Sequence, residues 1–181
     1  ELTASIENLP LSLANAFLPA GFGLLGSATA QVELIWQAGL LSGTVDWEQA
    51  DTVLRVAGAN DQTTDVRMPR ANLHANFRDG GVAAKAAVSI EPGVTGEVDF
   101  ALDKLDADAR LEAELRLQGD DWSWISAVVP EIDGFKGGVA ALVNARGPVL
   151  APEFSGDLVW SDGGILIPAF NVPLEDINVR I

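Results

Sequence analysis

Few side chains in this chain could perform acid–base, nucleophilic or metal chemistry. His74 is the only histidine and the chain has no cysteine, so thiolate nucleophiles and thiolate metal sites are excluded. His74 falls on the polar side of an alternating segment, between Leu73 and Ala75. This position favours a solvated histidine over a metal ligand or a general base.

The acidic residues raise two further possibilities, a cation site and an acid–base pair. Residues 119–121, Gly-Asp-Asp, could bind a metal, but they directly precede a helical pattern, and an aspartate that caps the helix explains them better. The pairs Glu112/Glu114 and Asp106/Asp108 fall on a solvated strand face and in a polar turn, where nothing raises the pKa of a carboxyl group. We therefore expect no catalytic residues, no cofactor and no metal.

The most regular part of the chain is the segment 93–119, which alternates between apolar and polar residues. Apolar residues take every second position from Val94 to Leu102 and again from Ala109 to Leu117, on either side of the polar turn 104–108. Because successive side chains of a strand point to opposite faces, this pattern predicts a hairpin with one apolar and one charged face. At about 3.3 Å per residue, each strand is roughly 33 Å long.

Similar alternation runs through most of the chain. It predicts further strands at residues 1–8, 24–36, 41–48, 52–56, 71–77, 82–90, 135–146, 154–161, 164–167 and 174–181. Residues 10–18 and 122–129 have the apolar spacing of short helices, which Pro19 and Pro130 end. Asp120 or Asp121 is expected to cap the second helix. The polar stretch 58–69 is expected to be a loop.

The sequence also contains an internal repeat. A shift of 111 residues matches Ser12, Ala16 and Pro19 to Ser123, Ala127 and Pro130. With a further insertion of two residues, the repeat also matches Ser42, Gly43 and Trp47 to Ser155, Gly156 and Trp160. Both copies read strand, short helix, proline, glycine-rich strand, and a strand that ends in tryptophan. We therefore predict a first module at residues 1–107 and the start of a second, truncated repeat at residues 108–181, continuous with the first.

Composition and charge exclude several classes of protein. The hydrophobic content of 48 % is ample for a folded core, and the net charge is −15, with 26 acidic against 11 basic residues. A phosphate backbone would be repelled, so nucleic acid is not an expected partner. Residues 8–31 carry no formal charge, but prolines and glycines interrupt them, which argues against a transmembrane helix. Alternation starts at the first residue, so we expect a piece of a longer protein whose localisation signals lie outside it.

A sheet of about ten amphipathic strands must cover its apolar face. Two helices of about nine residues are too small for this, and a β-sandwich, which remains possible, usually has shorter strands and a core of large residues. Here the apolar rows contain many alanines and glycines, including Ala84, Ala86 and Ala113. We therefore expect an all-β fold, an elongated curved sheet that forms a trough with a hydrophobic concave face.

Acyl chains fit such a trough. At about 0.8 kcal/mol per methylene, two chains of about sixteen carbons gain roughly 25 kcal/mol over water. Tryptophans at strand ends, such as Trp36 and Trp47, could either pack or line the groove. The predicted lining consists of apolar residues at alternating positions: Leu34, Val45, Leu73, Phe77, Val82, Val88, Ile90, Val98, Phe100, Leu102, Leu111, Leu115, Leu117, Val139, Val143, Phe154, Leu158 and Trp160.

Most of the chain resembles a known family. Residues 124–181 contain a proline-ended helix, Gly-Gly-Val-x-Ala at 137–141, Ala-Pro-Glu-Phe-Ser-Gly at 151–156, Ile-Leu-Ile-Pro at 165–168 and Leu-Glu-Asp-Ile-Asn at 174–178. In this arrangement they resemble the repeating segment of the TamB family, in the AsmA-like group of bacterial envelope proteins, and residues 6–36 resemble the same unit. We identify the chain as a fragment of the C-terminal region. It departs from the pattern at Ala38-Gly39, which replaces the proline-containing turn of the second copy.

The resemblance implies a taco-shaped sheet with a hydrophobic groove, anchored elsewhere in the inner membrane and crossing the periplasm of a Gram-negative bacterium. It implies transfer of phospholipid toward the outer membrane, cooperation with the outer-membrane barrel TamA, and contact with adjacent modules of the same chain. It supplies no catalytic residues. The expected function is a lipid conduit that shields acyl chains. The alternative is a structural scaffold or chaperone module for the assembly of outer-membrane or autotransporter proteins. A carbohydrate-active enzyme would need two carboxylates in one cleft, which the pattern does not offer.

Overall fold

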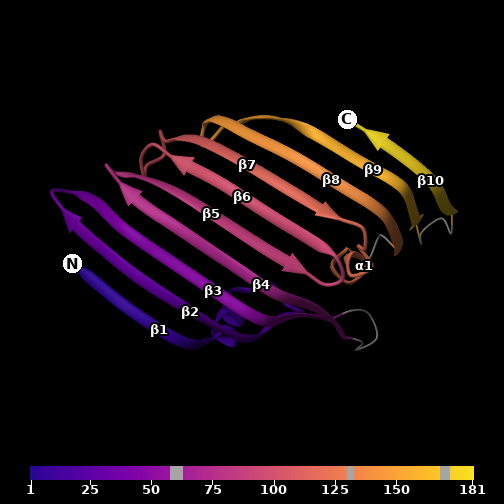
Figure 1. The fold of residues 1–181 in the computed structure, drawn as a ribbon, viewed down its shortest axis with the longest axis horizontal. Coiled ribbons are helices and arrows are strands. Elements are labelled where there is room, and N and C mark those ends of the chain that lie inside the picture. Colours follow the sequence, from indigo (N-terminus) through magenta and orange to yellow (C-terminus); the bar gives the residue numbers. More distant parts are fainter. Residues whose placement is uncertain (58–62, 130–132, 168–171) are drawn as a thin grey trace.

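The computed structural model describes residues 1–57, 63–129, 133–167 and 172–181. In these residues ten strands form one antiparallel sheet, with the strands side by side in sequence order (Figure 1). The strands are β1 Leu2–Pro10, β2 Phe22–Gln37, β3 Leu40–Ala57, β4 Thr63–Arg78, β5 Gly81–Ile90, β6 Val94–Leu102, β7 Arg110–Gly119, β8 Asp133–Pro148, β9 Glu153–Ile167 and β10 Val172–Arg180. Two short helices, η1 Leu11–Phe17 and α1 Ile125–Val128, join β1 to β2 and β7 to β8.

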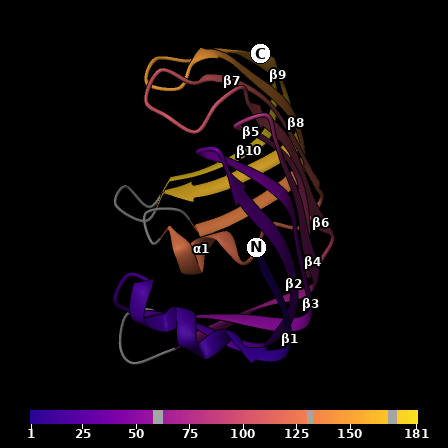
Figure 2. The same cartoon turned by 90° about the vertical axis from the view of Figure 1, so that its left-hand side faces the viewer.

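The sheet curls into a trough, as the side view shows (Figure 2). Both helices lie on its inner side. The side chain of Asn15 fixes η1 to β2, because its Oδ1 accepts a hydrogen bond from the backbone N–H of Leu24 at 2.7 Å. The predicted all-β fold with a curved open sheet is therefore confirmed.

Between the bulges, regular strand registers make side chains form rows across the trough. Directly paired residues of antiparallel strands lie on the same face of a sheet, so each apolar position continues the row of its neighbour. One row crosses nine strands through Ile6, Ala30, Trp47, Leu73, Ala86, Val98, Leu115, Val143 and Gly156. The apolar face is thus continuous from β1 to β9, including the predicted hairpin of β6 and β7.

The pairing of β1, β2 and β3 is repeated 111 residues later in β7, β8 and β9. Ala4 pairs with Val32 and Val32 with Val45; at the same shift Leu115 pairs with Val143 and Val143 with Gly156. The predicted two-residue insertion is therefore wrong. Trp160 corresponds to Gln49 and not to Trp47, since it pairs with Val139 as Gln49 pairs with Ala28. The division into modules at residue 107 remains a prediction.

The repeated register includes its irregularities. Gly26 and Gly137 both have positive φ angles, 124° and 104°, and each lies at a register shift between the second and third strand of its copy. Asp51 and Asp162, also 111 residues apart, have φ angles of 53° and 49°. Such bulges bend strands and increase their twist, so both copies bend at the same place.

Several predicted elements differ from the structure. Residues 10–18 form a 3₁₀ helix over Leu11–Phe17, and the second helix is only Ile125–Val128, with Trp124 at its N-cap and no side-chain cap. Asp121 instead accepts a hydrogen bond from the backbone N–H of Ser123 at 2.9 Å. The predicted loop 58–69 is wrong from residue 63 onward, because β4 begins at Thr63 and pairs with β3. Residues 58–62 lie outside the described residues.

Gly43 provides a test of the close approach between β2 and β3. A Cβ atom there would overlap the Glu33 carbonyl oxygen, whereas one at Gly39 in the β2–β3 turn would meet nothing within 4 Å. Both glycines have positive φ, 126° and 81°, so alanine is strained by about 1–2 kcal/mol at either position. We expect Gly43→Ala to lower the free energy of unfolding by about 2 kcal/mol more than Gly39→Ala. Urea denaturation of both variants measures the difference, and equal losses would contradict the register of this hairpin.

Candidate functional site

The eighteen predicted lining residues all lie on one face of the sheet. The strand registers place them in parallel rows without exception. Two observations show that this is the concave face. Gly119 lies in one of these rows, and a Cβ built on it would come within 3.1 Å of the Trp122 ring. Trp122 leads into α1, which lies on the inner side of the curled sheet (Figure 2). Whether these residues contact lipid remains a prediction.

The centre of the trough is packed from small residues beneath larger ones. Ala75, Val82 and Ala84 are buried, and partly buried hydrophobic residues pack against them: Val45, Leu73, Phe77, Phe100 and Leu102. Alanines on the curved floor let the large side chains of neighbouring strands meet above them. The floor is therefore close-packed around Ala75, Val82 and Ala84.

Other apolar side chains of the concave face remain uncovered. Leu115 is 41 % exposed, Phe154 71 % and Ile6 42 %. In the described residues the sheet has no second layer over this face apart from the two short helices. Soluble monomers rarely leave contiguous apolar patches of more than a few hundred Å² in water. Exposed apolar surface of this kind is typical of an interaction site.

An aromatic cluster joins the start of β8 to the middle of β9, and sequence reasoning missed most of it. The rings of Phe135 and Trp160 stack with centroids 4.9 Å apart, and the ring of Trp122 meets Phe135 edge-on at 6.4 Å. Trp160 Nε1 donates a hydrogen bond to the Lys136 carbonyl oxygen at 3.0 Å, so this tryptophan serves packing. Trp36 differs, because it is 67 % exposed near the β2–β3 turn.

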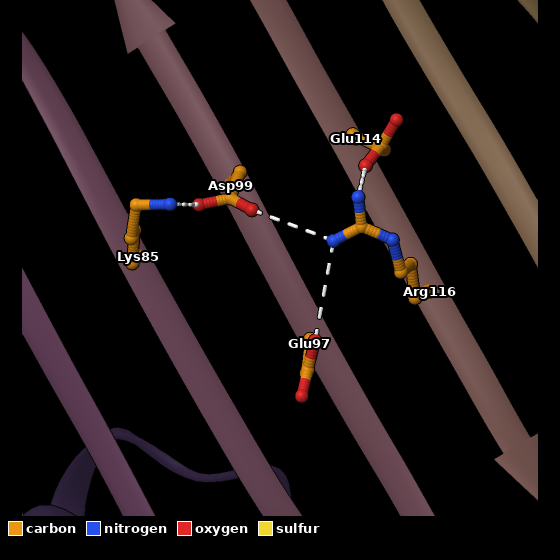
Figure 3. A network of polar contacts seen from close by, with 5 residues as sticks. All are labelled: Lys85, Glu97, Asp99, Glu114 and Arg116. Carbon is orange, nitrogen blue, oxygen red and sulfur yellow. Dashed lines mark ion pairs between the residues drawn. The ribbon is translucent and has the colours of Figure 1, made fainter.

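The convex face is polar and carries cross-strand ion pairs (Figure 3). Arg116 of β7 lies among Glu97, Asp99 and Glu114, and Lys85 Nζ is 2.8 Å from Asp99 Oδ1. All these side chains are solvated, so each pair contributes at most about 1 kcal/mol. A shallow hollow of about 480 Å³ lies over Ala83 and Ala101 on this face. It is open to solvent, and we assign no ligand to it.

The residues considered for chemistry lie on exposed surfaces, and three of them, His74, Glu112 and Glu114, border the convex hollow. His74 Nδ1 is 2.6 Å from Asp46 Oδ1 on the convex face, and Asp106 accepts a hydrogen bond from the backbone N–H of Asp108 within a turn. Glu112 and Glu114 share the convex face of β7. Among the described residues, no group of three histidine, aspartate or glutamate side chains could hold a metal ion.

Two carboxyl groups have lowered pKa values for local reasons. The hydrogen-bonded guanidinium of Arg55 lowers the pKa of Asp65, and the backbone N–H of Ser123 lowers that of Asp121. A lowered pKa in the folded state stabilises the fold above the ordinary pKa, and this contribution is lost as the pH falls through the lowered value. Both groups are on the surface, so the effect on stability is small.

The described strands thus form an open trough with an apolar inner face and a charged outer face. The model of the TamB N-terminal domain matches residues 1–159, so the chain belongs to the TamB family, a family of bacterial envelope proteins. The expected C-terminal origin is wrong, since the matching model describes the N-terminal domain. Neither a curated protein nor a solved structure matches the chain. No helix in the described part of the chain is long and apolar enough to cross a membrane.

Proposed function

We propose that this segment is part of a lipid conduit, in which the concave face shields phospholipid acyl chains while they cross the periplasm toward the outer membrane. The uncovered apolar face, continuous over nine strands, carries this proposal. Membership in the TamB family supports it, as envelope assembly requires lipid to leave the inner membrane. The segment acts without catalysis, cofactor or metal, and the barrel TamA is the expected acceptor at the outer membrane.

The shape of the groove suits movement better than tight binding. Leucine, valine, alanine and phenylalanine side chains form most of its floor, and in the described row that runs from Ala28 to Leu158 only Gln49 is polar. A methylene gains about 0.8 kcal/mol on leaving water for either this lining or a bilayer. Because the two environments are nearly equal, a lipid can enter and leave the groove without a deep energy minimum.

Photo-crosslinking in cells tests the proposal at two neighbouring positions of β7. We expect a photoreactive amino acid at Leu115, on the concave face, to capture phospholipid, and the same residue at Glu114, on the convex face, to capture at least tenfold less. The two positions share strand, depth and expression level, so only the face differs. Equal capture at both positions, or none at Leu115 in a protein that crosslinks elsewhere, would contradict the conduit.

A scaffold for outer-membrane protein assembly is the second candidate, and the open sheet edges favour it. In the described residues β1 and β10 each pair on one side only, and Leu2 and Leu174 are 58 % and 43 % exposed. Free edges can accept an added strand from another protein. Crosslinks from these positions to an unfolded outer-membrane protein, together with no lipid at Leu115, would favour the scaffold.

A further inference from the structure

The concave face offers no charged side chain to a phospholipid head group. Its rows pass through Leu111, Ala113, Leu115 and Leu117 of β7, and every described member of these four rows is uncharged. Arginine and lysine are the side chains that bind phosphate most strongly. Because these rows contain neither, a lipid in the groove is held by its acyl chains, and its head group stays in water at the opening of the trough.

The connections between the strands border this opening. Because the ten strands are antiparallel and lie in sequence order, successive connections alternate between the two margins of the sheet. Figure 2 shows η1, α1 and the loop between β6 and β7 on the inner side of the curl. The described connections, here called the lips, are residues 11–21, 38–39, 79–80, 91–93, 103–109, 120–129 and 149–152. A head group at the opening therefore lies beside the lips.

The lips are strongly acidic. Their single basic residue is Lys104, and their seven acidic residues are Asp79, Glu91, Asp103, Asp106, Asp108, Asp120 and Asp121. Lys104 Nζ lies 3.2 Å from Asp106 Oδ1, so the one cation of the lips is already paired with an aspartate. The lips therefore surround an uncharged groove with negative charge.

The remaining basic residues lie elsewhere. Ten of the 11 basic residues of the chain are within strands. In the centre of the sheet they project from the convex face, where Lys85 and Arg116 both meet Asp99, at 2.8 and 3.6 Å (Figure 3). The sheet itself separates these cations from the groove. A head group at the opening thus meets the acidic lips and not the basic residues of the convex face.

We propose that the lips act as an electrostatic filter, which admits phospholipids with a zwitterionic head group in preference to those with a net negative charge. The filter rests on the proposed conduit function and sets the class of lipid that the groove carries. A zwitterionic head group contains an ammonium group, whose attraction to the lip carboxylates balances the repulsion of its phosphate. An anionic head group such as that of phosphatidylglycerol contains no cation, so the lips repel it.

Competition between two lipids in the same vesicles tests the filter. The purified full-length protein, with a photoreactive residue at Leu115, is illuminated with vesicles of phosphatidylethanolamine and phosphatidylglycerol in equal amounts and with identical acyl chains. We expect at least threefold more phosphatidylethanolamine adducts at 0.01 M salt and a ratio near one at 1 M, because the Debye length falls from about 30 Å to about 3 Å. Equal capture at 0.01 M salt, or a preference that persists at 1 M, would overturn the filter and leave the conduit standing.

Removing charge from one lip tests where the filter lies. Asp103→Asn, Asp106→Asn and Asp108→Asn together remove three negative charges from the loop between β6 and β7. Asp103 Oδ1 accepts a hydrogen bond from the backbone N–H of Arg110 at 2.7 Å, and Asp106 Oδ1 accepts one from that of Asp108 at 2.9 Å. Asparagine keeps this side-chain oxygen as an acceptor, so the loop should keep its fold. We expect the ratio of the two lipids at 0.01 M salt to fall by at least half.

The matched control removes the same charge from the convex face. Glu48→Gln, Glu97→Gln and Glu114→Gln change strand positions whose registers place them on the side away from the groove. We expect this variant to retain the preference of the unaltered protein. An equal loss of preference in the two variants would show that total charge selects the lipid, and would overturn the assignment to the lips. Capture of neither lipid at Leu115 would contradict the conduit and the filter together.

Discussion

Leu115→Arg is expected to reduce phospholipid transfer to the outer membrane at least tenfold. Leu115 lies in the central row of the concave face, between Val98 and Val143, so every acyl chain that follows the groove must pass it. A charged side chain in hydrocarbon costs about 2.5–3.5 kcal/mol, and each 1.4 kcal/mol corresponds to about a tenfold change in an equilibrium constant. The rate at which labelled phospholipid reaches the outer membrane measures the effect.

The matched control is Glu112→Arg on the same strand. Glu112 pairs with Ala101 and Arg146 on the convex face, so an arginine there adds the same side chain without entering the groove. Leu115 is 41 % exposed, which lets an arginine at this position stay hydrated in the empty trough, and both variants should remain folded. Normal transfer by a folded Leu115→Arg protein would contradict a conduit along this face.

Trp122→Ala is expected to cause the largest loss of stability among single substitutions in the wall of the trough. Trp122 is 5 % exposed, its ring lies close to Gly119, and it meets both Trp124 and Phe135. Truncating a buried tryptophan costs about 3–5 kcal/mol, because contacts are lost and a cavity remains. Urea denaturation of the purified protein, followed by fluorescence, measures the change in the free energy of unfolding.

Trp36→Ala provides the comparison for this substitution. Trp36 is 67 % exposed near the β2–β3 turn, so its removal should change the free energy of unfolding by no more than about 1 kcal/mol. Similar losses in the two variants would show that the aromatic cluster does not support the wall.

The face of each strand could be predicted from the sequence because the register is so regular. Alternation places Val98 and Leu115 on one side of their strands, and unbroken pairing brings these residues into one row. A single one-residue slip would have moved a whole strand to the other face. The polar residues from 63 onward misled the prediction, because β4 begins at Thr63 and carries a cross-strand ion pair, Arg55 with Asp65 at 2.7 Å. Charged residues on exposed strands resemble loops in sequence.

The aromatic cluster could not be read from the sequence. The sequence repeat was aligned by its tryptophans, which placed Trp47 opposite Trp160 and required a two-residue insertion. The strand pairing instead makes Trp160 the counterpart of Gln49. At the shift of 111 residues Trp122 and Phe135 correspond to Leu11 and Leu24, so the first copy gives no aromatic signal. The helices were predicted too long, because each is a short connection whose length depends on the strands it joins.

A crosslinking scan along β7 tests the central claim most directly. A photoreactive residue is placed in turn at each position from 110 to 118 of the full-length protein, and phospholipid adducts are counted in cells. The open trough predicts a period of two residues, with adducts at Leu111, Ala113, Leu115 and Leu117 and few at the positions between them. Adducts without this period, or no adducts at any position of a functional protein, would contradict the account.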